Sequence, residues 1–250
     1  MVLEKLKIEF FATFVLVYIT GLFLIEFHNK NVDILGLSTG FFIIHLILIW
    51  ATKEISGAHL NPIISLSLAI SGHITFKKAL LYSLFQLAAS LSALSFLRMG
   101  IPNEIAQTLS AKTMFGFPLN HSIHPARQIG FEIFGSFFLV LFYYLLVIER
   151  PFIKHVYAVG LAAFYFASLP FMFFFSGAGL NPARMIAYCL VGGQPWLFYI
   201  WFVGPFVGGI FGGLLGNLFL SENSTEMKKR VREEKKNAIL ELERERIKYN

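Results

Sequence analysis

A seven-residue pattern that ends in Asn-Pro occurs twice in the chain. Both copies read Ser-Gly-Ala-x-Leu-Asn-Pro, at residues 56–62 and 176–182. Asn is a preferred helix N-cap, and Pro suits the first helical position, where its missing N–H is not needed. Two ordinary capped turns would also fit this pattern, but each copy lies between a long apolar run and a short one. A helix that begins inside an apolar protein directs free N–H groups and the positive end of its dipole at something within the membrane.

The side chains of the two motif asparagines could act as donors to a passing molecule. The amide oxygen can be held by the backbone while the NH2 group faces a lumen. Two such donors would hold the oxygen atom of a small molecule and turn its hydrogens away from the centre. That orientation interrupts a hydrogen-bonded water wire, and converging positive helix ends repel cations and protons. The expected pore motifs are Asn61, Pro62, Ile63, Asn181, Pro182 and Ala183.

Five further polar residues stand in apolar surroundings. Arg184 follows Asn-Pro-Ala and is expected to line the pore near its outer mouth; the alternative is a surface arginine that snorkels. Glu9 and Glu132 near the starts of the first and fourth long runs could relay protons, as in a coupled transporter. We favour the alternative that they accept hydrogen bonds from loop backbone. Gln86 shares this ambiguity, and His59 either lines the path or has a structural role.

Composition indicates the elements that position these residues. The chain is 56% hydrophobic and 14% charged, well below the charged fraction of about a quarter in soluble domains. Six runs are long enough to cross a bilayer, which takes about 20 residues each. They are approximately Ile8–Phe27, Ile34–Thr52, Phe76–Leu97, Gln128–Ile148, His155–Phe175 and Trp196–Leu220. Two runs that begin at the motifs, Asn61–Ile70 and Asn181–Leu190, are too short and are expected to be re-entrant half-helices.

The chain is an internal repeat. The segment that begins at Glu9 resembles the one that begins at Glu132, 123 positions later (132 − 9), and the two motif Asn are 120 apart (181 − 61). Each half has three full spans, an odd number, so the halves take opposite orientations. An inverted repeat brings equivalent elements together at the bilayer midplane. We therefore expect an all-α membrane protein, residues 1–220, with halves of about 1–98 and 127–220 whose half-helices meet by their N-termini.

Lys and Arg in the flanks predict the orientation. They favour two cytoplasmic termini and an extracellular loop of about residues 98–127. The expected membrane is the plasma membrane. The loop contains a glycosylation sequon at Asn120. The charged tail, residues 221–250, is expected to be a solvated cytoplasmic helix, with anionic lipid or a partner helix as the alternative ligand. The sequence contains no metal-ligand set, nucleophile with a base or phosphate loop, so neither an enzyme nor a cofactor is expected.

The paired motifs, the two Glu, Gln86 and Val203-Gly204-Pro205-Phe206 resemble the aquaporins, the major intrinsic protein family. The resemblance runs from about Glu4 to Leu220. It implies six tilted helices and two half-helices around one pore in each subunit, and a homotetramer in the lipid bilayer. It also implies passive passage of water or of small neutral solutes such as glycerol, with no nucleic-acid partner.

The resemblance also implies the positions of the family's outer selectivity filter. Phe41 lies 20 residues before the first motif Asn, Ala178 lies three before the second, and the arginine is Arg184. The fifth-span position is ambiguous: counting back from the second motif gives Leu169, and counting forward from the start of the span gives Ala167. Neither residue is the His typical of strict water channels, and an aromatic residue typical of glycerol channels is missing at 178.

Three other positions favour water over glycerol. Glycerol channels usually have Asp where this chain has Met185, and Lys or Arg where it has Cys189. The pair Trp201-Phe202 is the aromatic kind seen in water channels. The family usually has Ala at the position of Ile63, whose bulk is expected to shift or narrow the junction. The expected function is a passive water channel that excludes ions and protons. A channel for glycerol or other small neutral solutes is the first alternative, and a coupled transporter or a scaffolding protein is less favoured.

Overall fold

The computed structural model of the protein describes residues 2–105, 107, 113–114, 117–118, 123–148 and 156–220. Within these residues, six helices are long and apolar enough to cross a membrane, which confirms the six expected spans. The first five are α1 (Val2–His28), α2 (Ile34–Ser56), α4 (Phe76–Gly100), α6 (Pro125–Tyr143) and α7 (Val156–Ser176). A π-helical turn, η1 (Tyr144–Ile148), extends α6, and the sixth span (Pro195–Leu220) begins with the 3-10 turn η2 (Pro195–Leu197).

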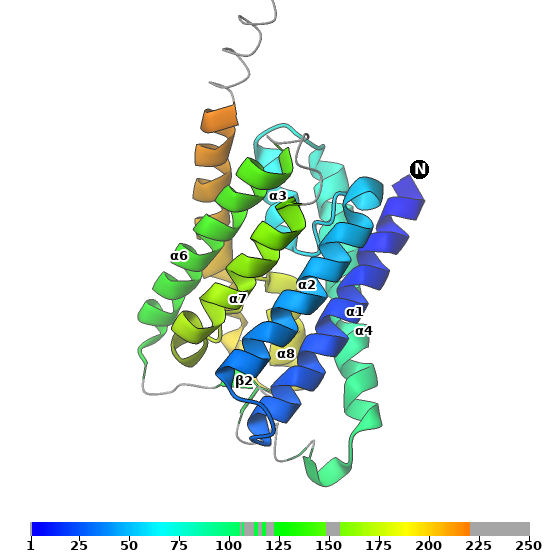
Figure 1. The fold of residues 1–250 in the computed structure, drawn as a ribbon, viewed down its shortest axis with the longest axis vertical. Helices are drawn as coiled ribbons and strands as arrows, with labels where there is room; N and C mark the ends of the chain where they lie inside the picture. Colours follow the sequence, from blue (N-terminus) through cyan, green and yellow to red (C-terminus); the bar gives the residue numbers. More distant parts are fainter. Residues whose placement is uncertain are drawn as a thin grey trace, which may run out of the picture.

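Two short helices lie within the bundle. They are α3 (Pro62–Ile70) with 9 residues and α8 (Pro182–Val191) with 10 residues, both too short to cross a membrane. Figure 1 shows α3 in the half of the bundle that contains the N-terminus and α8 in the opposite half. The expected all-α fold with six spans and two half-helices is therefore confirmed.

The long helices begin and end where local chemistry predicts. The side chain of Asp33 accepts the backbone N–H of Gly36 at 2.8 Å and caps α2. At the other end of α2, Gly57 takes the left-handed conformation at φ 104°, which stops the helix and turns the chain back into the bundle. This turn starts the loop that leads to the first motif.

The outer surface of the bundle is apolar. Large side chains such as Phe11, Trp50, Phe134 and Phe171 are 60 to 74% exposed. Exposed apolar side chains on every long helix, around a core that contains buried Glu and Arg, are what a lipid-facing bundle requires. The protein is a multi-pass integral membrane protein.

The sixth span approaches α6 closely because it presents glycines to it. A side chain at Gly208 would overlap the backbone of Ile133, and one at Gly212 would overlap that of Phe137. Small residues permit such close backbone contact between membrane helices, where van der Waals packing drives association. The sixth span is thereby fixed against α6, and it presents Gly209 and Gly213 to Ile63 and Ser67 of α3.

The connection between the halves includes a short antiparallel pair, β1 (Thr113–Met114) with β2 (Phe117–Pro118). This pair packs near α7 and α8. Asn120, with its sequon, and the charged tail from residue 221 lie outside the described residues. The expectations for glycosylation and for the tail therefore stay predictions.

Candidate functional site

The two motif asparagines are the N-caps of the two half-helices. Asn61 accepts the N–H of Ile63 at 3.1 Å through its side-chain oxygen. Asn181 accepts the N–H groups of Ala183 at 3.1 Å and of Arg184 at 3.3 Å. A proline follows each asparagine at the first helical position. Each amide oxygen is thus held by backbone, and each NH2 group is directed away from its own helix.

Each asparagine also bonds across to the loop of the other half. The Asn61 amide donates to the carbonyl of Leu180 at 2.8 Å, and the Asn181 amide donates to the carbonyl of Leu60 at 2.8 Å. The two half-helices therefore meet by their N-termini, and their positive dipole ends converge on one point in the interior. Both asparagines are almost completely buried, at 1% and 3% exposure.

The loops before the asparagines have an unusual backbone in common. In the first loop (57–61), Ala58 and Leu60 have φ of 52° and 50°; in the second loop (177–181), Ala178 and Leu180 have 49° and 53°. Residues with a side chain are disfavoured in this left-handed region, at a cost of about 1 to 3 kcal/mol each. Such a conformation persists only where surrounding groups determine it. The same alternation in both loops shows that the inverted repeat extends to single residues.

Two buried carboxylates hold these loops. Glu9 accepts the Ser56 hydroxyl at 2.6 Å and the backbone N–H groups of His59 and Leu60 at 3.0 and 2.8 Å. Glu132 does the same in the second half, where the donors and their distances are the Ser176 hydroxyl (2.7 Å), Gly179 N–H (2.9 Å) and Leu180 N–H (2.7 Å). Neither carboxylate has any exposed surface. Each is thus engaged as an acceptor of loop hydrogen bonds.

Gln86 belongs to the first of these networks. Its side-chain amide donates to Glu9 at 2.9 Å and lies 3.5 Å from the Ser65 hydroxyl. Ser65 is on α3 and also lies 2.9 Å from Nδ1 of His59. Gln86 therefore connects α4 to the first loop and to the half-helix that follows it.

Arg184 is turned inward rather than toward the surface. Its Nη2 donates to the carbonyls of Ala178 and Gly179, at 3.0 and 2.6 Å. The guanidinium lies 5.0 Å from the centroid of the Phe41 ring, and only 2% of the residue is exposed. A snorkelling surface arginine does not fit this burial. The structure brings together three of the expected filter positions, with the arginine fixed by the second loop and facing an aromatic ring from α2.

Comparison with known proteins agrees with this geometry. The model of the major intrinsic protein family matches residues 2–215. The chain belongs to this family. As a major intrinsic protein it is a channel for water or small neutral solutes and is not an enzyme.

The relatives of this chain include both plant and animal proteins. It is 28% identical to Aquaporin NIP1-4 of Oryza sativa subsp. japonica over 205 residues, 82% of this chain and 72% of that one. It is 25% identical to Aquaporin-2 of Rattus norvegicus over 225 residues, 89% of this chain and 81% of that one. The X-ray structure of the aquaglyceroporin from Plasmodium falciparum has the same fold, with a TM-score of 0.75 and 19% identity over 87% of this chain and 96% of that one.

The two fifth-span candidates in this major intrinsic protein differ in burial. Leu169 is 1% exposed and lies in the core, whereas Ala167 is on the exposed face of α7. Ala167, two residues from Leu169, is about 200° away around the helix, so it cannot face the same interior path. Burial therefore favours Leu169 over Ala167 as the filter candidate, and the assignment stays a prediction.

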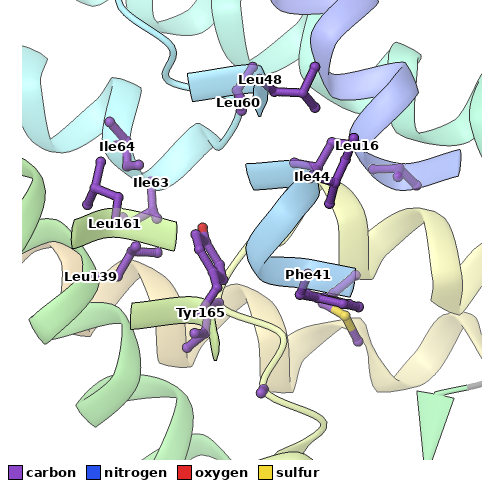
Figure 2. Packing of buried hydrophobic residues seen from close by; sticks show 14 of the residues in the cluster. Leu16, Phe41, Ile44, Leu48, Leu60, Ile63, Ile64, Leu139, Leu161 and Tyr165 are labelled. Atoms are coloured by element: carbon purple, nitrogen blue, oxygen red, sulfur yellow. The ribbon is translucent and has the colours of Figure 1, made fainter. Parts of the chain in front are cut away.

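The Ile63 side chain fits into the interior because Gly209, which faces it, has no side chain. It is completely buried, and a Cβ on Gly209 of the sixth span would overlap its side chain. Figure 2 shows Ile63 among the buried apolar side chains beside Leu161 and Leu139. The extra volume relative to Ala is taken up at least in part against the sixth span, so the bulk need not displace the motif.

Two residues of the interior were not expected from the sequence. His45 and Tyr165 line an internal cavity together with His59 and Leu60, and their rings stack at 3.7 Å between centroids. The signal was available: His45 is one helical turn after the filter position 41, and Tyr165 is one turn before 169. Residues four apart share a helix face, so both had to face the same interior.

Proposed function

We propose that the protein is a passive water channel that excludes ions and protons. The observation that carries the proposal is the pair of asparagines at the meeting of two helix N-termini, each with its oxygen held by backbone. In this arrangement the amide N–H groups are donors to the oxygen of a permeating molecule. A water molecule that accepts from them points its own hydrogens toward the two exits, and protons cannot hop through it. The two positive helix ends raise the energy of a cation at the same point.

The outer filter would be formed by Phe41, Arg184, Ala178 and Leu169. Arg184 supplies a positive charge and N–H donors, and the other three leave a wall that is mainly apolar. A wall of this kind offers few partners to the hydroxyl groups of a polyol, which favours water. Met185, Cys189 and the Trp201-Phe202 pair also favour a water channel by their resemblance to that branch of the family.

Glycerol is the second candidate permeant. Leu169 stands where strict water channels have a His, so the filter lacks that donor and is more apolar there. An apolar side chain at this position can contact the carbon atoms of a small uncharged solute that passes alongside water. The same experiment must therefore measure the permeability to water and the permeability to glycerol.

The test is stopped-flow light scattering of proteoliposomes that contain the full chain, with water, glycerol and urea side by side. Water permeability well above that of empty vesicles, with low glycerol and urea permeability, is the expected result. Permeability equal to that of empty vesicles would contradict the proposal. Uptake that saturates, depends on an ion gradient and is abolished by Glu9→Gln or Glu132→Gln would instead indicate a coupled transporter.

The assembly and orientation belong to the same proposal. We expect a homotetramer with one pore in each subunit and both termini in the cytoplasm of a cell whose plasma membrane contains the protein. Cross-linking in native membranes tests the assembly. Protease access to a tag placed after residue 250, in sealed vesicles of known sidedness, tests the orientation.

A further inference from the structure

A stack of flat groups extends inward from the filter. The Arg184 guanidinium lies over Phe41, the Phe41 ring lies 6.0 Å from that of His45, and the His45 ring lies 3.7 Å from that of Tyr165. The last two distances join ring centroids, with planes 28° and 21° apart. His45 is on α2 and Tyr165 is on α7, so the stack crosses from one span to the other.

Both members of this His45–Tyr165 pair are held in place. Nδ1 of His45 lies 2.7 Å from the carbonyl of Phe41, one turn earlier in α2. The Tyr165 hydroxyl lies near the side chain of Asn61. Figure 2 shows that the Tyr165 oxygen points toward the side on which Leu60 and Ile63 lie. The two rings are 4% and 6% exposed.

The Asn61 side chain has one donor left for a permeating molecule. It already gives one amide hydrogen to the carbonyl of Leu180, and its oxygen accepts from Ile63. The Tyr165 phenol lies near this amide. A water molecule that approaches the second amide hydrogen therefore does so beside the phenol.

The space beside the pair is small. His45, Tyr165, His59 and Leu60 border a cavity with room for about one water molecule. The rest of its wall is mainly apolar and includes Leu16, Ile49, Ile64, Leu139 and Leu161. A wall of this kind offers water few hydrogen-bond partners. The polar atoms of His45 and Tyr165 are therefore important partners for a water molecule at this depth of the path.

We propose that His45 and Tyr165 form a second constriction, at the asparagine junction, which limits permeation more than the outer filter does. Water passes when the Tyr165 side chain leaves Asn61 and its ring turns from His45. This inference rests on the proposed channel function and identifies the residues that set its rate and its size limit. It places the narrowest point one helical turn inward from Phe41 and Leu169.

The test compares osmotic water permeability of proteoliposomes with equal amounts of wild type, Tyr165→Val and Tyr165→Phe. Tyr165→Val removes the ring from the path, and we expect a rise of roughly fivefold or more, with measurable glycerol entry, because pore width controls passage. Tyr165→Phe removes the phenol oxygen near Asn61 but keeps the ring, so a smaller rise and a lower activation energy are expected. Phe166→Val is the matched control. Its ring packs at 6.3 Å against Phe42, and its permeability should equal that of wild type.

The outcomes separate this inference from the channel function. Conduction by wild type with no increase in either Tyr165 variant overturns the constriction and leaves the channel intact. A wild type at the level of empty vesicles with a conducting Tyr165→Val supports the constriction but contradicts the proposed conduction of water by the wild type. If no protein exceeds empty vesicles, the channel function itself fails and the constriction with it. Should Tyr165→Val not fold, the activation energy of Tyr165→Phe decides, since a value equal to that of wild type contradicts the proposal.

Discussion

The two re-entrant loops share their supports but differ in the donors that satisfy their carbonyls. In both, a buried Glu accepts one serine hydroxyl and two backbone N–H groups. At the first loop, phenol hydroxyls donate to the backbone carbonyls. Tyr82 donates to the carbonyl of Ser56 at 2.9 Å, and Tyr143 donates to the carbonyl of Gly57 at 2.8 Å. The carbonyls of the second loop bond instead with Trp201 at Ser176 (2.7 Å) and with Arg184.

This difference separates the roles of the two loops. The shared bonds fix the backbone and bring the asparagines together, so they determine the fold. The unshared donors determine the chemistry at each end of the path, because phenols are neutral and a guanidinium is charged. The first loop is thus a neutral wall, and the second supplies the positive charge of the proposed filter.

Removing a shared support should have the largest effect. Glu132→Ala leaves a serine hydroxyl and two backbone N–H groups buried without their acceptor, at about 1 to 3 kcal/mol for each group. We expect Glu9→Ala and Glu132→Ala each to lose several kcal/mol of stability, seen as loss of the monodisperse peak after heating in detergent. Glu54→Ala, at a side chain that is 76% exposed, is the control and should behave as wild type. If only one of the two Glu variants lost stability, the two loops would not depend equally on their buried carboxylates.

Removing an unshared donor should change selectivity rather than folding. Arg184→Ala takes away the charge and the donor to two carbonyls. In the Tyr165→Val background, where the inner constriction is open, we expect it to raise glycerol and urea permeability on the order of tenfold. Tyr143→Phe removes a neutral donor from the first loop and should leave the ratio of water to glycerol permeability unchanged. Both are measured by light scattering of the same vesicle preparation. Equal selectivity of Tyr165→Val with and without Arg184→Ala would show that Arg184 does not line the filter.

The contact between the motif residue Ile63 and Gly209 gives a third test, with a smaller expected effect. Gly209→Ala puts a methyl group against Ile63 and should cost about 1 to 3 kcal/mol. Combination with Ile63→Ala should recover part of that loss, with a coupling of at least about 0.5 kcal/mol in a double-mutant cycle of thermal stability. Gly130 has open space around it, so Gly130→Ala with Ile63→Ala is the additive control. Additivity in both cycles would mean that Ile63 and Gly209 adapt independently.

The smallest effect is expected from mercury. The single cysteine of the chain, Cys189, is on α8 in the second half and has no exposed surface. A buried thiol in apolar surroundings reacts slowly, so inhibition of water permeability should stay below about twofold. Strong inhibition that disappears in Cys189→Ser would show that a path reaches the back of α8.

Much of this arrangement could be predicted because it depends on local rules. The length of apolar runs predicts the spans, and Asn-Pro after a long run predicts each half-helix. The similar separations of the two Glu (132 − 9 = 123) and of the two motif Asn (181 − 61 = 120) predict the repeat, and three spans in each half predict its inversion. These signals need only residue type and position along the chain.

The interior details depend on contacts between distant residues, which spacing does not report. Whether Leu169 or Ala167 faces inward depends on the rotation of α7, and a count of residues does not give that rotation. The fit of Ile63 depends on Gly209 in another span. The meeting of His45 and Tyr165 requires both helices at their final distance, so neither residue was singled out by its own surroundings in the sequence.

The bonds from each asparagine to the opposite loop also have a consequence for the assembly of the protein. They join residues 119 and 121 positions apart, just before helices too short to cross a bilayer. During synthesis the first half enters the membrane long before Asn181 exists, so α3 must wait without its partner. Contacts of such sequence separation form late. The channel interior is therefore expected to be the last part to become ordered, after all six spans have been inserted.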